Sequence, residues 1–169
     1  MRIDMIIRLE EAADAEAICH ITQQAFDGAA HSSGTEGAII DGLRAAGTLT
    51  LSLVAEKDGE IVGHVAFSPV TVDGRDVGWF GLGPISVKPG FQRSGTGGRL
   101  IREGLARLRS DGAKGCVVLG DPGYYHRFGF ETDPAMTFEG VPPEYFMVLP
   151  FIGSRPTGQV TYQPAFYLT

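Results

Sequence analysis

A glycine-rich stretch decides the fold of this chain: Gln92-Arg93-Ser94-Gly95-Thr96-Gly97-Gly98. The apolar segment 79–87 precedes it and the amphipathic segment 99–110 follows it, so it lies where a predicted strand leads into a predicted helix. Backbone N–H groups at a helix start have no intrahelical partner, and with the helix dipole they attract anions. Glycines also let a ligand approach the backbone closely. We interpret this stretch as a binding site for a pyrophosphate group.

Three glycine-rich phosphate loops compete for this interpretation, and the residues separate them. A P-loop needs lysine after its second glycine, but no lysine follows Gly95 in the stretch 90–96. The dinucleotide fingerprint G-x-G-x-x-G begins at Gly95 and Gly97, but Leu100 stands where its third glycine belongs. A third pattern is [QR]-x-x-G-x-[GA], where x is any residue. The stretch Gln92–Gly97 matches it at every position.

This third pattern is the acyl-CoA loop of the GNAT superfamily, and the chain resembles a GNAT N-acetyltransferase. The flanks support the resemblance, because Ile85–Pro89 precedes the loop and an amphipathic helix follows it. The resemblance implies acetyl-CoA as co-substrate and no metal. It also implies that residues 92–98 hold the pyrophosphate, with Arg93 adding charge, and that Ile85 and Val87 contact the pantetheine arm and the carbonyl group.

Length and charge predict one globular domain over residues 1–169 that does not bind nucleic acid. A chain of 169 residues with 43% hydrophobic and 20% charged residues can bury a core. The net charge of −6 argues against a nucleic-acid interface, which needs a basic surface. Basic residues concentrate between Lys88 and Lys114. A locally positive loop suits a phosphorylated cofactor, although most of these side chains are expected on a solvated helix face.

The cysteines and the N-terminus predict a cytoplasmic location. Cys19 and Cys116 lie in apolar segments without metal-ligand spacing, as expected of free thiols in a reducing compartment. The N-terminus lacks an apolar signal core, and no apolar run reaches transmembrane length. We therefore expect neither a metal nor a membrane partner.

Hydrophobic periodicity and turn residues predict an α/β (α+β) fold with a mixed, mostly antiparallel sheet flanked by helices. The predicted order is β-α-α-β-β-β-α-β-α-β-β, the GNAT order. The predicted strands are Met5–Leu9, Leu49–Lys57, Glu60–Val72, Val77–Val87, Cys116–Leu119, Tyr145–Phe151 and Gln159–Tyr162. The predicted helices are Asp14–Phe26, Glu36–Ala46, Arg99–Ser110 and Tyr124–Phe128.

Three local features refine this prediction. Pro84 interrupts the strand before the loop, which predicts a bulge there, and in GNAT proteins this strand splays from its neighbour to admit the pantetheine arm. The last strand, Gln159–Tyr162, is expected to pair with Tyr145–Phe151. The proline-containing run 131–144 is expected to be irregular surface chain.

A second GNAT signature is a tyrosine four positions before a Gly-Phe pair, and Tyr125 has this position in the stretch Tyr125–Phe130. The resemblance implies that its hydroxyl lies near the cofactor sulfur and acts as general acid for the departing thiolate. Tyr124 is the alternative if the short helix is rotated, and both tyrosines could simply pack. The preceding stretch 120–123 is shorter than in most relatives, with Asp121 near the place of a common asparagine.

A general base is not singled out by the sequence. His31, Glu36 and His64 are candidates, and a water chain could serve as well. The only carboxylate of the strand before the loop is Asp76, at its start. Neither cysteine has an obvious neighbouring base, which agrees with direct transfer without an acyl-enzyme.

The expected function is therefore transfer of an acetyl group from acetyl-CoA to a primary amine by direct attack. The alternative is a non-catalytic acyl-CoA-binding sensor or regulatory module. The acceptor could be a small-molecule amine or an amine of a peptide or protein, and the sequence does not choose between them. The apolar segment 145–162 could form an open sheet edge, so a homodimer is possible.

Overall fold

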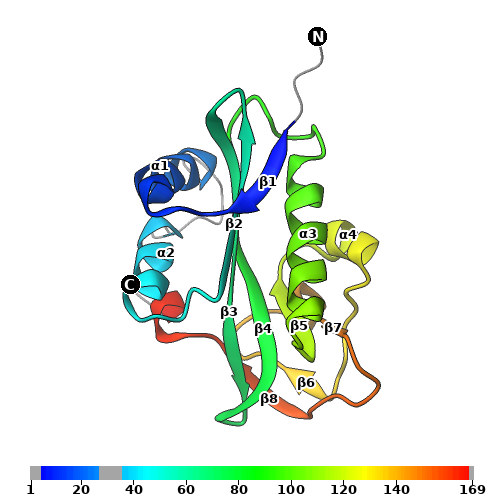
Figure 1. The fold of residues 1–169 in the computed structure, drawn as a ribbon. Coiled ribbons are helices and arrows are strands. Elements are labelled where there is room, and N and C mark those ends of the chain that lie inside the picture. Colours follow the sequence, from blue (N-terminus) through cyan, green and yellow to red (C-terminus); the bar gives the residue numbers. More distant parts are fainter. Residues whose placement is uncertain (1–4, 27–35, 168–169) are drawn as a thin grey trace.

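The computed structural model describes residues 5–26 and 36–167, and Figure 1 shows a central sheet between two layers of helices. The strands are β1 (Ile6–Leu9), β2 (Leu51–Lys57), β3 (Glu60–Val72), β4 (Arg75–Val87), β5 (Gly115–Leu119), β6 (Met136–Thr137), β7 (Phe146–Pro150) and β8 (Gly158–Thr161). The helices are α1 (Ala15–Phe26), α2 (Glu36–Ala45), α3 (Thr96–Ser110) and α4 (Pro122–Tyr125). The predicted α/β fold and its element order are confirmed, with β6 as an addition.

The sheet is mixed and mostly antiparallel, as predicted. Its strands lie in the order β1-β2-β3-β4-β5-β7. Only β4 and β5 run parallel within this path, paired from Trp79 opposite Gly115 to Leu82 opposite Val118. They are joined through α3, which makes the predicted strand-helix-strand crossover.

Helices cover both faces of the sheet (Figure 1). On one face, α3 buries the apolar stripe that its sequence predicts, consisting of Leu100, Ile101, Leu105 and Leu108. This stripe belongs to the same core cluster as Leu53 and Phe67 of the sheet. On the other face, Ile18 and Ile21 of α1 and Ile40 of α2 pack in a cluster with Val54. The helices thus cover the sheet from both sides, and the glycine-rich loop connects the interior strand β4 to α3.

The predicted bulge lies in β4 at Gly83-Pro84. In the register with β3, Val65 is opposite Ile85, whereas Phe67 is opposite Leu82, so β4 has one extra residue between these pairs. The pairing of β4 with β5 also stops at Leu82. β5 ends at Leu119, one residue after the partner of Leu82, so the last part of β4, up to Val87, is not paired with β5 and leads into the glycine-rich loop.

The partner of the last strand was predicted wrongly. β8 pairs with the end of β3 and with β6, not with β7. The hairpin residue Asp73 explains the choice, because its N–H donates to the Gln159 carbonyl at 2.9 Å and its carboxylate accepts from the Gln159 N–H at 2.8 Å. β7 is already paired along its whole length with β5 on one side.

The segment 131–144 is also more ordered than predicted. Glu131 forms a two-way backbone bridge with Val148 of β7, and Met136–Thr137 forms the strand β6. Phe138 then packs against Phe146 and Tyr162, with ring centroids 5.5 and 5.4 Å apart. Aromatic packing and strand addition fix a segment whose prolines suggested a loop.

Candidate active site

The glycine-rich loop leads directly into α3, which begins at Thr96 rather than at the predicted Arg99. Gly95 precedes the helix with a φ of 87°, a left-handed conformation that glycine adopts without steric cost. Glycine has no side chain to cap this helix end, so N–H groups of the first turn remain available to a ligand. The start of α3 could therefore bind an anion through these N–H groups.

A pocket of about 610 Å³ opens beside this loop, a size typical of small-molecule sites. Its lining combines the loop with residues of β4, α3 and the α4 region: Val87, Phe91, Gln92, Arg93, Gly95, Gly97, Gly98, Arg102, Tyr124, Arg127 and Phe128. Three of these described lining residues are arginines and none is acidic. The lining charge suits a phosphorylated ligand.

Gly97 is the point at which the predicted contacts meet. A Cβ atom at this position would lie 3.2 Å from the Tyr124 hydroxyl, 3.7 Å from Val87 and 3.9 Å from Ile85. The structure thus brings together three of the predicted cofactor residues and one tyrosine of the second signature. A ligand bound to the backbone of Gly97 would lie where the side chain of any other residue at this position would be.

Three polar side chains of the loop make hydrogen bonds within it or to the end of β4. The Gln92 amide donates to the Val87 carbonyl at 3.1 Å, which ties the loop to the end of β4. The Ser94 hydroxyl donates to the Phe91 carbonyl and lies 2.9 Å from the Thr96 hydroxyl. Thr96 is only 3% exposed, and neither Ser94 nor Thr96 lines the pocket.

Two lining arginines had not been singled out as ligand contacts. Arg102 is one of the basic residues between Lys88 and Lys114, most of which were expected on a solvated helix face, and its guanidinium lies 3.1 Å from where a Cβ of Gly98 would be. Its position one turn after Gly98 is a usable sequence signal, because residues four apart share one helix face. Arg127 lies over the Tyr124 ring, 4.6 Å from its centroid, a contact that the sequence does not reveal.

Helix α4 places the two signature tyrosines in different surroundings. Its N-cap is Asp121, whose carboxylate accepts from the Gly123 N–H at 2.9 Å, so the residue near the family's asparagine has a structural use. Tyr124 lines the pocket, with its ring edge-on to Phe128. Tyr125 lies in the core cluster beneath and is 9% exposed.

Close packing holds Tyr125 in one orientation. Its ring is edge-on to Phe130 and Tyr124, with centroids 6.0 and 5.0 Å away. A Cβ on Gly120 would overlap the same ring, so only glycine fits at the end of β5. Burial raises the pKa of Tyr125 to about 12. The phenol therefore keeps its proton at neutral pH and can donate a hydrogen bond.

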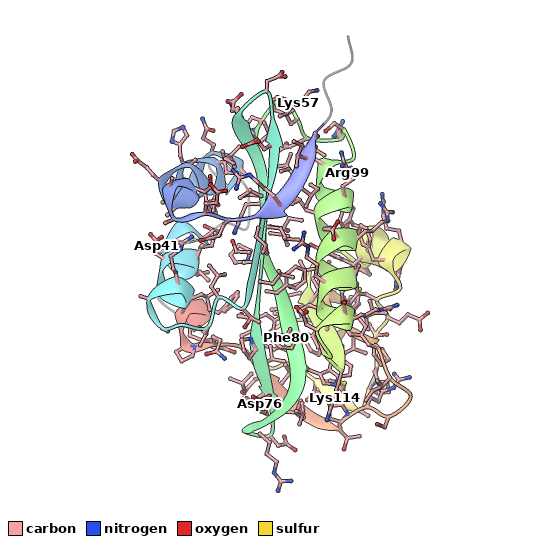
Figure 2. All side chains as sticks on the ribbon, viewed as in Figure 1. Asp41, Lys57, Asp76, Phe80, Arg99 and Lys114 are labelled. Atoms are coloured by element: carbon pink, nitrogen blue, oxygen red, sulfur yellow. The ribbon has the colours of Figure 1, made fainter. Side chains whose placement is uncertain are left out.

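Of the residues considered as general bases, those that the structure describes lie at different distances from the pocket lining. His31 is outside the described residues, and Glu36 is the first residue of α2. Asp76 lies at the end of β4 away from the loop, as Figure 2 shows by its distance from Arg99 at the start of α3. His64 is 0% exposed, and burial lowers its pKa to about 4.

A chain of polar contacts, running from the partly exposed Arg44 to the buried His64, accounts for this histidine. Arg44 pairs with Glu10 at 3.0 Å, and Glu10 accepts from the Ser52 hydroxyl. Since that hydroxyl has only one proton, the His64 Nε2–H is the donor in its 2.7 Å bond to the Ser52 oxygen. His64 is thus a neutral core residue that links strands and helix, without access to the pocket lining.

The buried thiol of Cys116 in β5 does not offer a nucleophile. Burial raises the pKa of the Cys116 thiol far above its ordinary value, so it is not a thiolate nucleophile. Within residues 5–26 and 36–167, no group of three or more His, Cys, Asp or Glu side chains is placed to hold a metal ion. In the same part of the chain, no helix has the length and apolar character to cross a membrane.

Comparison with known proteins decides the family. The model of the acetyltransferase (GNAT) domain matches residues 6–132. The chain belongs to the GNAT acetyltransferase family. An Escherichia coli (strain K12) relative, the uncharacterized N-acetyltransferase YhbS, is 41% identical over 128 residues, which are 75% of this chain and 74% of YhbS. Membership of the GNAT family makes the chain an acyltransferase.

Two solved GNAT structures extend the likeness to nearly the whole chain. A GNAT family acetyltransferase from Brucella melitensis, in complex with acetyl-CoA, is 52% identical with a TM-score of 0.88, covering 96% of this chain and 98% of that one. The structure of YhbS from Escherichia coli in complex with CoA is 34% identical with a TM-score of 0.91, covering 99% of this chain and 94% of that one. The GNAT resemblance and fold inferred from the loop are confirmed.

Proposed function

We propose that this GNAT protein transfers the acetyl group of acetyl-CoA to a primary amine by direct attack. The observation that carries the proposal is that Gly97, Val87 and Tyr124 line one pocket together with three arginines. Ile85 lies next to this lining, 3.9 Å from the Cβ position of Gly97. The complexes of the Brucella melitensis and Escherichia coli relatives with acetyl-CoA and CoA support the choice of co-substrate.

The loop and its arginines would bind the phosphates of the co-substrate. N–H groups at the start of α3 donate to a pyrophosphate, while Arg93, Arg102 and Arg127 neutralise its charge. Ile85 and Val87 lie on the part of β4 that no longer pairs with β5. Backbone N–H groups at this splay can polarise the thioester carbonyl and stabilise the charge that develops on its oxygen.

Tyr125 remains our candidate for assisting departure of the thiolate. A pKa of about 12 makes full proton transfer to a thiolate unfavourable, since an ordinary thiol has a pKa of about 8.5. The phenol would therefore act mainly as a hydrogen-bond donor. Tyr124, in the pocket lining, would contribute to binding the co-substrate.

The amine must lose a proton before it attacks, and we assign this step to water. His64 is sealed in the core and Asp76 lies far from the loop, so neither contacts the pocket. The pocket is open to solvent, which can accept the proton directly.

The deciding experiment measures thiol release from acetyl-CoA by the whole purified chain with a panel of primary amines. The proposal expects amine-dependent release together with acetylated product identified by mass spectrometry. Calorimetric binding of acetyl-CoA without turnover of any amine would instead support the sensor reading. Absence of binding would overturn both.

A further inference from the structure

A second pocket, which the proposed cofactor site does not use, lies between the segments 132–138 and 143–146. Its volume is about 400 Å³, within the range of small-molecule sites. Phe138 and Phe146 stack in its wall with centroids 5.5 Å apart and planes 26° apart, and Met136 and two prolines add apolar surface. Such a wall fits a flat or extended apolar group.

The charged groups of this pocket are acidic. Asp133 and Glu144 are in the lining, and between residues 128 and 154 the chain carries four acidic residues and no Lys, Arg or His. Asp133 is already paired with Arg155 at 2.8 Å. Glu144 is exposed, and it takes part in none of the ion pairs among the described residues. A positive group beside the apolar wall would find this carboxylate available, and aromatic faces also attract cations.

The position of the pocket connects it with the proposed chemistry. Met136 and Phe146 belong to the core cluster of β5, β7 and β8, whereas the stripe of α3 lies in a separate cluster. Phe146 is opposite Leu119, the last residue of β5, close to where β4 parts from β5. The Tyr145 carbonyl, next to Glu144, accepts from the Gly120 N–H at 2.9 Å.

Gly120 in turn touches the candidate catalytic tyrosine, because a Cβ there would lie 3.0 Å from Tyr125 Cδ2. Two backbone neighbours therefore join the acidic side of the pocket to Tyr125. We propose that this pocket binds the acceptor, and that the acceptor is a small primary amine with an apolar body. The body packs on Phe138 and Phe146, and the ammonium group is attracted by Glu144. The role of this pocket as the acceptor site depends on the proposed acetyl transfer. The binding of an amine to the pocket does not depend on it.

Binding is tested first, without acetyl transfer, by ligand-observed NMR titration of the whole chain. The probes are 2-phenylethylamine, its neutral counterpart 2-phenylethanol, and trimethyl(2-phenylethyl)ammonium, which cannot be acetylated. Both cations should bind saturably and several-fold more tightly than the alcohol, because aromatic and carboxylate groups both favour a positive charge.

Variants locate the bound cation. Phe138→Leu keeps apolar volume but removes the aromatic face, and should weaken binding about threefold to tenfold. Glu144→Gln should weaken it about threefold to fivefold, as for an exposed charge pair. Glu131→Gln is the matched control, because it makes the same charge change outside the lining and should leave binding unchanged.

Turnover then tests the acceptor role. The quaternary ammonium should compete with 2-phenylethylamine but not with acetyl-CoA, and Phe138→Leu should raise the KM for the amine alone. No saturable binding of either cation, or equal binding in all three variants, overturns the pocket assignment even if other amines are acetylated. If binding follows the variants but 2-phenylethylamine releases no thiol while other primary amines do, the pocket remains an amine site and its acceptor role is overturned. If no primary amine releases thiol, the proposed transfer is overturned as well.

Discussion

At the scale of single residues, the functional difference between Tyr124 and Tyr125 arises from one step along a four-residue helix. Successive helical residues point about 100° apart, so neighbouring tyrosines cannot share one environment. The sequence signature selects Tyr125, but the rotation of so short a helix depends on Phe130 and Gly120, which the signature does not describe. The signature therefore names the two tyrosines as candidates, but it does not predict which of them is exposed to the pocket.

Removing each hydroxyl separately should distinguish the two tyrosines. Tyr125→Phe keeps the packed ring, so stability should change little, while turnover should fall by about 10²–10³-fold if the hydroxyl donates a hydrogen bond to the departing thiolate in the slow step. Tyr124→Phe should weaken acetyl-CoA binding a few-fold and affect turnover less, as expected for one neutral hydrogen bond. Steady-state kinetics and calorimetry on equal folded protein give both values. Full turnover by Tyr125→Phe would show that another group assists the thiolate, and a larger loss of turnover in Tyr124→Phe would assign that role to Tyr124.

A side chain at Gly97 should block the co-substrate without unfolding the chain. Valine would project toward the Tyr124 hydroxyl, Val87 and Ile85, into the space assigned to the ligand. We expect calorimetric affinity for acetyl-CoA to fall by about tenfold or more, since the lost contacts lie at the centre of the site. Gly153→Val is the control, because nothing lies within 4 Å of its Cβ position. Wild-type affinity in a folded Gly97→Val protein would contradict the assignment of the loop.

At the scale of elements, local signals predicted what local residues determine. Gly83-Pro84 marked the bulge in β4, and the stripe of α3 marked its buried face. The partner of β8 escaped prediction, since it is set by Asp73 and Gln159, 86 residues apart in sequence. The start of α3 was placed too late because the glycines of the loop suggested coil, whereas the helix begins among them.

The close approach of α3 to the sheet makes a further prediction at this scale. Alanine normally stabilises a helix by about 1 kcal/mol relative to glycine. At Gly104, however, a Cβ would overlap the buried Phe67 ring. Gly104→Ala should therefore destabilise the chain by about 1–3 kcal/mol in urea unfolding. In a background that already carries Phe67→Leu, Gly104→Ala should cost less stability than in the wild type, because the two residues are coupled through one contact. Equal or higher stability of the single variant would show that α3 can move away from the sheet.

At the scale of the whole molecule, assembly remains a prediction. β7 is the last strand on its side of the sheet, but Glu131 already bridges part of its outer edge. β1 forms the opposite edge, where Ile6 and Leu9 are both more than half exposed. If the edge strands of two copies of the chain paired, this exposed apolar surface would be buried, so we expect a homodimer. Light scattering at micromolar concentration checks this, and the mass of one chain would exclude it.

The stability of the whole fold should also depend on pH through His64. Burial lowers the pKa of His64 from 6.5 to about 4, with Arg44 opposing and Glu10 favouring protonation. Between these two values the unfolded chain binds more protons than the folded chain, so the stabilising contribution is fully present above pH 6.5 and is lost as pH falls toward 4. The difference between these two pKa values corresponds to about 3 kcal/mol in the free energy of unfolding.

Urea unfolding between pH 5 and 7 isolates this effect, because Glu10, Asp14 and Asp133 have lowered pKa values and stay ionised in the folded state there. The free energy of unfolding should rise with pH across this range in the wild type. His64→Gln should be less stable throughout but should lose most of the slope, since its side chain does not titrate. His20→Gln, at an exposed position on α1, should keep the wild-type slope. If the free energy of unfolding of His64→Gln depends on pH as strongly as that of the wild type, another group carries the pH dependence. Protonation of His64 would then cost the folded state little.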